Sequence, residues 1–197
     1  MLNSAGGTVK TIINVGNNPY AVALDSAGNA YVVNSASNNV VKLSSSGSIL
    51  GTYLVGMQPQ DIIFVNIANV GYIFVTNVLD ITVNSLSTSG QILKTYNVGV
   101  GPVSLTSDGG GNVWVANSLD NTVSKISSAT GSISTYALGN YPEGIAVDSF
   151  GNVWVANYAD ASVSKLSSVA SSHSGASSLT GAFFSSIVSI VLTVQQI

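Results

Sequence analysis

A repeat of roughly 41 residues, marked by four prolines, constrains the fold of this 197-residue chain more than any other feature. Pro19, Pro59, Pro102 and Pro142 lie 40, 43 and 40 residues apart, and each opens the same order of apolar segments and turns. A unit of this size cannot bury its apolar face alone, so neighbouring copies must stack around a common core. The sequence therefore predicts a tandem array of four copies of one structural unit.

Each copy has the pattern of four short β-strands. In the first copy, YAVALD, AYVVN and VVKLS are rich in β-branched residues and are separated by Gly, Asn, Asp and Ser, as in strands joined by hairpins. The stretches 25–29, 108–112 and 148–152 are predicted hairpin turns, because Asp bonds turn amides and Gly or Asn accepts a positive φ. The second copy is degenerate, with three extra residues before Asn77. Four antiparallel strands per repeat form a propeller blade, so the predicted fold class is all-β, a four-bladed β-propeller.

All four repeats carry a family resemblance. The segments AYVVNSASNNVVKLSSSG, YIFVTNVLDITVNSLSTSG and VWVANSLDNTVSKISSATG resemble the YVTN repeats of surface-layer-type β-propeller proteins. The segment PEGIAVDSFGNVWVAN is similar to repeats of the NHL and virginiamycin B lyase propellers. The resemblance covers about residues 7 to 168. It implies the fold rather than one activity, because these families share a blade and differ in what the blades carry.

The repeats are out of phase with the chain by one strand. Residues 7–18 match the fourth segment of a blade and precede Pro19, whereas the last copy has only three segments, up to Leu166. The unpaired edge of that last blade would invite another strand. We therefore expect the spare N-terminal strand to complete the last blade, either in cis, closing a four-bladed ring, or in trans, linking chains into an oligomer or filament.

The chain divides into propeller repeats over 1–168, a Ser-rich linker over 169–178 and an apolar tail over 179–197. The tail contains no charged residue. It is predicted to form one or two strands in this chain, or a strand donated to a neighbouring subunit. A membrane anchor is a third possibility, but the tail is interrupted by serines and its apolar span is shorter than the roughly 20 residues that a helix needs.

Composition excludes several classes of partner and chemistry. Charged residues make up 7% of the chain, against roughly 25% in typical domains. The chain has five lysines, no arginine and a net charge of −3, which argues against nucleic acid as a partner, since phosphate binding needs clustered cations. There is no cysteine, hence no disulfide, thiol nucleophile or thiolate metal site.

The sequence predicts no catalytic residue, no metal site and no cofactor. Lyase-type propellers, to which the resemblance points, use histidines and a carboxylate around a divalent metal. Here the one histidine, His173, falls in the Ser-rich linker and none falls in a blade. Asp61 and Glu143 are the acids nearest the starts of the innermost strands. Two such ligands from opposite blades would hold Ca²⁺ only weakly.

The candidate ligand-binding residues directly follow the four prolines. Tyr20, Gln60, Val103 and Glu143 begin the innermost strands and are expected to surround one mouth of the central channel. Tyr and Gln suit a small polar ligand such as a sugar. The alternative interpretation is that these four side chains merely rim a narrow channel.

Two further positions recur from blade to blade. A lysine in the third segment is predicted to face solvent, at Lys42, Lys125 and Lys165. An aromatic residue in the second segment is predicted to pack between neighbouring blades, at Tyr31, Tyr72, Trp114 and Trp154.

These observations favour a non-enzymatic extracellular or cell-surface structural protein. Its partners would be further copies of itself, joined by β-strand exchange into a filament or a surface-layer-like array. The first alternative is a propeller module that binds a carbohydrate or a peptide. The second is a lactonase- or lyase-like enzyme. A nucleic-acid partner and a membrane location are not expected.

Overall fold

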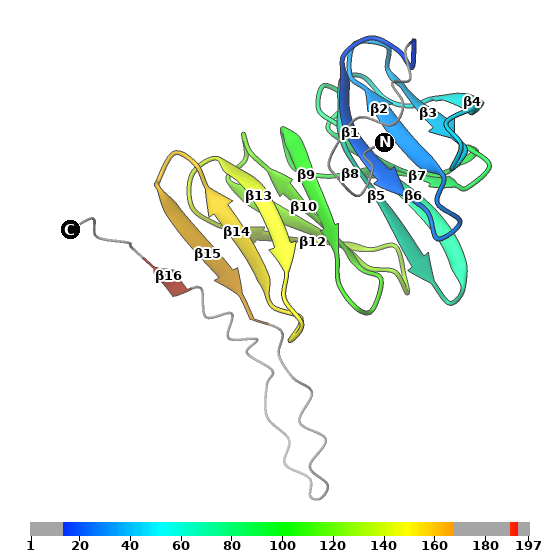
Figure 1. The fold of residues 1–197 in the computed structure, drawn as a ribbon. Helices are drawn as coiled ribbons and strands as arrows, with labels where there is room; N and C mark the ends of the chain where they lie inside the picture. The colour runs from blue at the N-terminus through cyan, green and yellow to red at the C-terminus, as the bar shows by residue number, and fades with distance from the viewer. Residues whose placement is uncertain (1–13, 168–189, 193–197) are drawn as a thin grey trace, which may run out of the picture.

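The computed structural model describes residues 14–167 and 190–192, which form β-strands and their connections (Figure 1). Blade 1 consists of β1 (Pro19–Leu24), β2 (Ala30–Asn34), β3 (Asn39–Leu43) and β4 (Ile49–Leu54). Blade 2 consists of β5 (Pro59–Ile67), β6 (Val70–Asn77), β7 (Thr82–Ser87) and β8 (Ile92–Asn97). Blade 3 consists of β9 (Pro102–Ser107), β10 (Val113–Asn117), β11 (Thr122–Ile126) and β12 (Ile133–Ala137). Blade 4 consists of β13 (Pro142–Val147), β14 (Val153–Asn157), β15 (Ser162–Leu166) and β16 (Ile190–Leu192).

Each blade is a four-stranded antiparallel sheet whose strands lie side by side in chain order. The predicted all-β fold with four four-stranded blades is confirmed. The first strand of every blade begins at one of the four prolines, which lack an N–H and suit the first residue of an edge strand. Within the described ranges the chain has no helix, so no helix there could cross a membrane.

The hydrophobic core lies between blades. One face of each blade, here named its outgoing face, packs on the incoming face of the next blade. Between blades 1 and 2, the outgoing residues Tyr31, Val33 and Val40 meet Ile62, Ile73, Val75 and Leu86. Between blades 2 and 3, Val65, Phe74 and Val83 meet Leu105, Val113, Val115 and Ile126. Between blades 3 and 4, Trp114 and Val123 meet Val153, Val155 and Leu166. The same arrangement of apolar residues therefore recurs at all three interfaces.

The four blades form an arc in which the last blade does not pack on the first. The innermost strands contact in the order β1, β5, β9 and β13, and among the described residues β13 makes no comparable contact with β1. Figure 1 shows the first and last blades set apart. Val22 is 61% exposed on the incoming face of blade 1, whereas its equivalent in blade 2, Ile62, is 3% exposed. Among the described residues, no other blade covers the incoming face of blade 1 or the outgoing face of blade 4.

The fourth strand of the last blade comes from the C-terminal tail. β16 pairs with β15 through three residue pairs, Val163 with Leu192, Ser164 with Val191 and Lys165 with Ile190. The fourth strands of the other blades pair through five. The sequence predicts that the N-terminal strand, residues 7–18, takes this position, but residues 7–13 lie outside the described residues. The linker 169–178, which includes His173, also lies outside the described residues.

Candidate functional site

The four residues predicted at the channel mouth line a single pocket. Tyr20, Gln60, Val103 and Glu143 surround a cavity of about 330 Å³ together with Tyr141. The geometry follows from the repeat: each residue next to a proline starts an innermost strand, and these strands lie against one another around the axis. Because all five side chains are at least partly exposed, the pocket is accessible from solvent.

Tyr141 was not predicted from the sequence, and its backbone is unusual. It precedes Pro142 and has a φ of 56°, a left-handed conformation that costs a non-glycine residue about 1–3 kcal/mol. Its amide donates to Asn121 Oδ1 at 2.9 Å, and its ring centroid lies 6.0 Å from that of Tyr158. The residues before the other three prolines also have positive φ, namely Asn18, Gln58 and Gly101. The positive φ therefore belongs to the link between blades, which every repeat shares.

Asp61 does not join Glu143 in the pocket. Its Oδ2 accepts hydrogen bonds from Ser104 Oγ at 3.0 Å and from the Leu105 amide at 2.9 Å, while Oδ1 accepts from the Ile62 amide at 2.8 Å. The carboxylate thus ties blade 2 to blade 3. Among the described residues no three His, Cys, Asp or Glu side chains gather where they could hold a metal ion. Asp61 and Glu143, the two acids considered from the sequence as calcium ligands, therefore do not line the same pocket.

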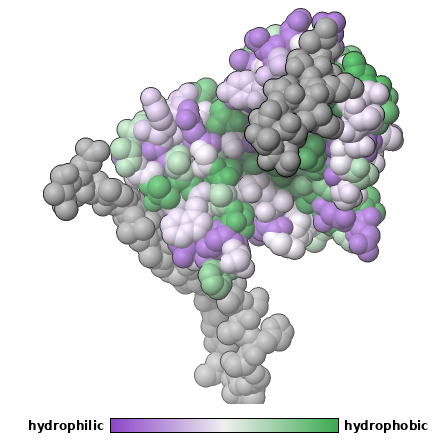
Figure 2. Space-filling view, in the orientation of Figure 1, coloured by the Kyte–Doolittle hydropathy of each residue, from purple (hydrophilic) through white to green (hydrophobic). Residues whose placement is uncertain are grey.

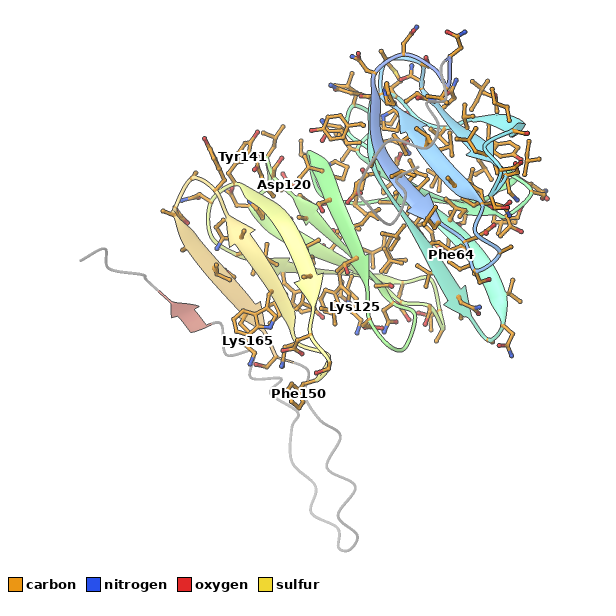
Figure 3. All side chains as sticks on the ribbon, in the orientation of Figure 1. Phe64, Asp120, Lys125, Tyr141, Phe150 and Lys165 are labelled. Carbon is orange, nitrogen blue, oxygen red and sulfur yellow. The ribbon has the colours of Figure 1, made fainter. Side chains whose placement is uncertain are left out.

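A second recurring constellation combines a turn aspartate, an aromatic ring and a lysine. In blade 3, Trp114 Nε1 donates to Asp108 Oδ2 at 3.1 Å, and Lys125 Nζ lies 5.0 Å from the centroid of the same ring. Blade 1 repeats it with Asp25, Tyr31 and Lys42, and blade 4 with Asp148, Trp154 and Lys165. Figure 3 places Lys165 and Phe150 at the end of the blades opposite Tyr141 and Asp120. The set therefore lies at the end remote from the channel mouth.

The lysines have a more specific position than the sequence predicts. Each was expected to face solvent, but the ammonium group lies over an aromatic ring, where the ring quadrupole attracts a cation. Lys42 Nζ also donates to the Thr88 carbonyl of blade 2 at 2.9 Å. The lysine thus covers its own blade's ring and, in blade 1, also holds the neighbouring blade.

Blade 2 lacks the aspartate and the lysine of this set, and its aromatic residue is a phenylalanine, which has no hydrogen-bond donor. Phe74 lies three residues before Asn77, as Tyr31 lies three residues before Asn34, so Phe74 is the equivalent of Tyr31. The assignment of Tyr72 to this position was wrong, because the three extra residues of blade 2 lie in the hairpin that precedes it. Val65 stands in place of the aspartate and Ser85 in place of the lysine.

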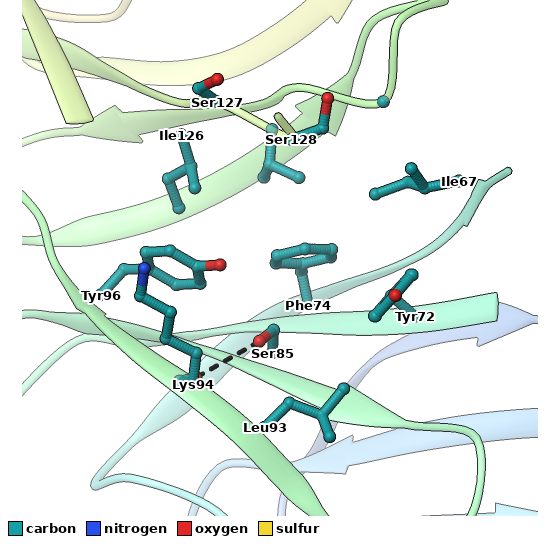
Figure 4. A pocket seen from close by; sticks show the side chains of 12 residues that line it. Ile67, Tyr72, Phe74, Ser85, Leu93, Lys94, Tyr96, Ile126, Ser127 and Ser128 are labelled. Atoms are coloured by element: carbon teal, nitrogen blue, oxygen red, sulfur yellow. Dashed lines mark hydrogen bonds between the residues drawn. The ribbon is translucent and has the colours of Figure 1, made fainter. Parts of the chain in front are cut away.

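A pocket of about 230 Å³ lies between blades 2 and 3, and Ser85, which stands where the other blades have a lysine, is one of its lining residues (Figure 4). Phe74, Tyr96 and Leu93 contribute apolar surface to it. Lys94, from the fourth strand, lies 4.8 Å from the Tyr96 centroid, and Ser85 Oγ donates to the Lys94 carbonyl at 3.4 Å. The lining residues of this pocket include no aspartate or glutamate.

The turn aspartates carry perturbed pKa values. Hydrogen bonds from Trp154 and Asn152 lower the pKa of Asp148 from 3.8 to about 2. Burial raises the pKa of Asp108, but hydrogen bonds from Asn112 and Trp114 outweigh it, so the pKa lies below its usual value. These are stabilising contacts of ionised carboxylates within closed turns, as expected of structural residues.

Acidification is expected to destabilise the fold through these carboxylates. Because the pKa of Asp148 is lower in the folded chain than in the unfolded one, its contribution is present above about pH 4 and is lost as the pH falls toward 2. Chemical unfolding between pH 6 and pH 2 should show the free energy of unfolding falling over that window. Asp148→Asn should flatten the slope, and Trp154→Phe, which removes the hydrogen-bond donor, should flatten it in part. Equal slopes in all three chains would contradict this assignment.

The comparisons with known proteins agree with this fold. No protein-family model matches the sequence, and no curated protein sequence matches it. Virginiamycin B lyase from Staphylococcus aureus superposes with a TM-score of 0.68 at 18% identity, over 77% of this chain and 53% of the lyase. A streptogramin B lyase gives 0.69 at 21% identity, over 79% and 53%. Hydrazine synthase from Kuenenia stuttgartiensis gives 0.67 at 17% identity, over 81% and 47%.

These similarities and the four blades define the chain as a β-propeller protein, with virginiamycin B lyase-like propellers among its structural neighbours. The chain spans about half the length of the structures that it matches. At such identities the similarity concerns the fold alone, and function must be argued from the residues of this chain.

Proposed function

We propose that this chain is a non-enzymatic structural protein of the cell surface or the extracellular space, and that it works by self-assembly through β-strand exchange. The observation that carries the proposal is the origin of the last blade's fourth strand. β15 ends at Leu166 and β16 begins at Ile190. A strand connected by so long a segment can pair with β15 of its own chain or of a neighbour, because the pairing contacts are the same in both cases.

The surface and the composition support a structural role. The face in Figure 2 is a mosaic of apolar and polar patches, and only 7% of the residues are charged. Charge repulsion between copies is therefore weak. A catalytically inactive form of the Staphylococcus aureus lyase has one histidine replaced by alanine. The one histidine of this chain, His173, lies outside the four repeats, so nothing in the blades matches that requirement.

Two deletions test strand exchange. Removing residues 179–197 should abolish oligomers in light scattering coupled to size exclusion, while the β-sheet circular dichroism persists. Removing residues 169–178 keeps the tail but shortens its connection, which should disfavour pairing within one chain and increase the oligomeric fraction. A full-length chain that is monomeric at every concentration would overturn the proposal. So would oligomers that are unaffected by loss of the tail.

A second candidate function is binding of a carbohydrate or a peptide at the channel mouth. The observation in its favour is that Tyr20, Tyr141, Gln60 and Glu143 face one pocket. Aromatic faces stack on the apolar faces of sugars, while the amide and the carboxylate bind hydroxyl groups. Oligosaccharide titrations by calorimetry would test it: Tyr20→Ala with Tyr141→Ala should abolish any binding, whereas Tyr20→Phe should preserve most of it. No heat change with the unaltered chain would remove this candidate.

A further inference from the structure

The three interfaces within the chain follow one rule. At each, an outgoing face with an aromatic residue and a valine packs on an incoming face with a β-branched residue or leucine. Val40 and Ile62 illustrate it, since they lie in the same buried cluster and are 0% and 3% exposed. Such interfaces join two different surfaces, so a blade has both halves of the contact and can pack on another blade at either side.

The incoming half of this contact is open at blade 1. Val22 and Leu24 occupy the positions that Ile62 and Phe64 occupy in blade 2, and they are 61% and 63% exposed. Neither side chain is charged, and they lie on the same face of β1 because they are two residues apart in a strand. Val22 and Leu24 thus form a small apolar surface, and the outgoing face of a blade is the surface that packs on the equivalent residues of blade 2.

The outgoing half is open at blade 4. Val163 is 39% exposed, whereas its equivalents Val40, Val83 and Val123 are fully buried. Ala156 is exposed, whereas the equivalent Ala116 is buried. Both residues line a hollow of about 380 Å³ on this face, together with Gly144 and Ala161. In the other three blades the next blade covers this face.

We propose that a second copy of this chain occupies both open faces. Blade 1 of the second copy packs on blade 4 of this chain, and blade 4 of the second copy packs on blade 1 of this chain, so that the two arcs form one eight-bladed ring. The proposal rests on self-assembly as the proposed function, but it uses blade faces rather than an exchanged strand. Head-to-tail contacts of this kind close into a ring when the rotation between copies allows it. Eight blades is within the propeller range.

Two observations favour a second copy over an unrelated partner. The open faces have the same residue types as the three internal interfaces, so the contact required is one that this sequence already forms three times. The arc also superposes on 53% of each of two lyase chains and leaves the remaining half unmatched. The arc is therefore similar to part of a longer propeller, which leaves space beside it for blades of another chain.

The absence of cysteine allows a clean cross-linking test of the full-length chain. Val22→Cys and Val163→Cys are made in separate chains, mixed, and treated with a short bismaleimide. A covalent dimer of twice the 20.0 kDa chain mass is expected only in the mixture. Leu119→Cys mixed with Val163→Cys is the matched control, since Leu119 is also 61% exposed but lies in a loop. Equal cross-linking in the control, or none in the test pair, would overturn the proposal.

A chain with both cysteines separates the remaining outcomes. A dimer joined by two cross-links is expected. Cross-linking within one monomer would mean that a single chain closes into a ring, and a ladder of higher species would mean an open polymer. Either of these two results would overturn the two-chain ring. Val163→Lys should raise the dissociation constant of the unmodified dimer at least tenfold without lowering the melting temperature of the monomer.

Repeating the cross-linking after deletion of residues 179–197 distinguishes the two proposals. Persistence of the Val22–Val163 dimer would support face pairing even if strand exchange fails. Oligomers of the full chain that do not cross-link through this pair would leave strand exchange standing and overturn face pairing.

Discussion

Trp114→Ala is expected to lower the free energy of unfolding by about 3–5 kcal/mol, whereas Trp154→Ala should cost less than half as much. The two tryptophans have the same local partners: each donates Nε1 to a turn aspartate and lies beneath a lysine. They differ in what lies beyond the blade. Trp114 is buried in the core between blades 3 and 4, and Trp154 is half-buried on an open face.

This pair compares a position with and without a neighbouring blade. One contact within the blade also differs, since the centroid of the Trp114 ring lies 5.7 Å from that of the Tyr136 ring, so Tyr136→Ala is measured alongside and its loss is subtracted. Denaturant unfolding should be measured at a concentration at which the chain is monomeric, so that assembly does not stabilise the open face. Equal losses in the two variants would show that blade 4 is covered in the monomer and would contradict the open arc.

Gly90→Ala is expected to cost about 2–4 kcal/mol, combining a left-handed backbone with overpacking. Gly90 has a φ of +88° in the turn between β7 and β8, and an added Cβ would overlap the ring of Tyr53 in blade 1. Tyr53 packs on the core between blades 1 and 2. The substitution should therefore disturb an interface between blades as well as a turn.

Gly28→Ala is the matched control for that substitution. Gly28 has a φ of +79° in a turn closed by the same kind of backbone hydrogen bond, and an added Cβ would meet only Ser45 Cβ at an ordinary 3.6 Å. It should cost about 1–2 kcal/mol, from backbone strain alone. If thermal or denaturant unfolding gave the two variants the same stability, Tyr53 would not be anchoring the turn of blade 2.

Periodicity made much of the fold predictable. A strand that starts at Pro19 has counterparts at the other three prolines, and symmetry then places the residues that follow them around one axis. This is why Tyr20, Gln60, Val103 and Glu143 line a single pocket. Because the blades repeat, residues at the same place in each repeat occupy the same place in each blade. The residue types at those places do not identify a ligand.

What could not be predicted depends on breaks in the repeat and on directions of side chains. The longer hairpin of blade 2 shifted the aromatic assignment from Phe74 to Tyr72, because length rather than residue type sets the register. The lysines recur at a strand position, but spacing does not reveal that the neighbouring strand places an aromatic ring beneath them. Tyr141 lines the pocket with a positive φ, and no residue-type signal marks a tyrosine as left-handed.

The open faces were also not evident in the sequence. Val22 and Val163 fit the apolar pattern of every blade, and only the absence of a neighbour distinguishes them from their buried counterparts. Whether a ring closes depends on the rotation between blades, which is a property of packing rather than of any one segment.

Sedimentation velocity of the full-length chain over a hundredfold range of concentration tests self-assembly most directly. Self-association predicts that the 20.0 kDa species gives way, as the concentration rises, to particles of twice that mass or larger. A single 20.0 kDa species at every concentration would contradict self-assembly as the function of this propeller.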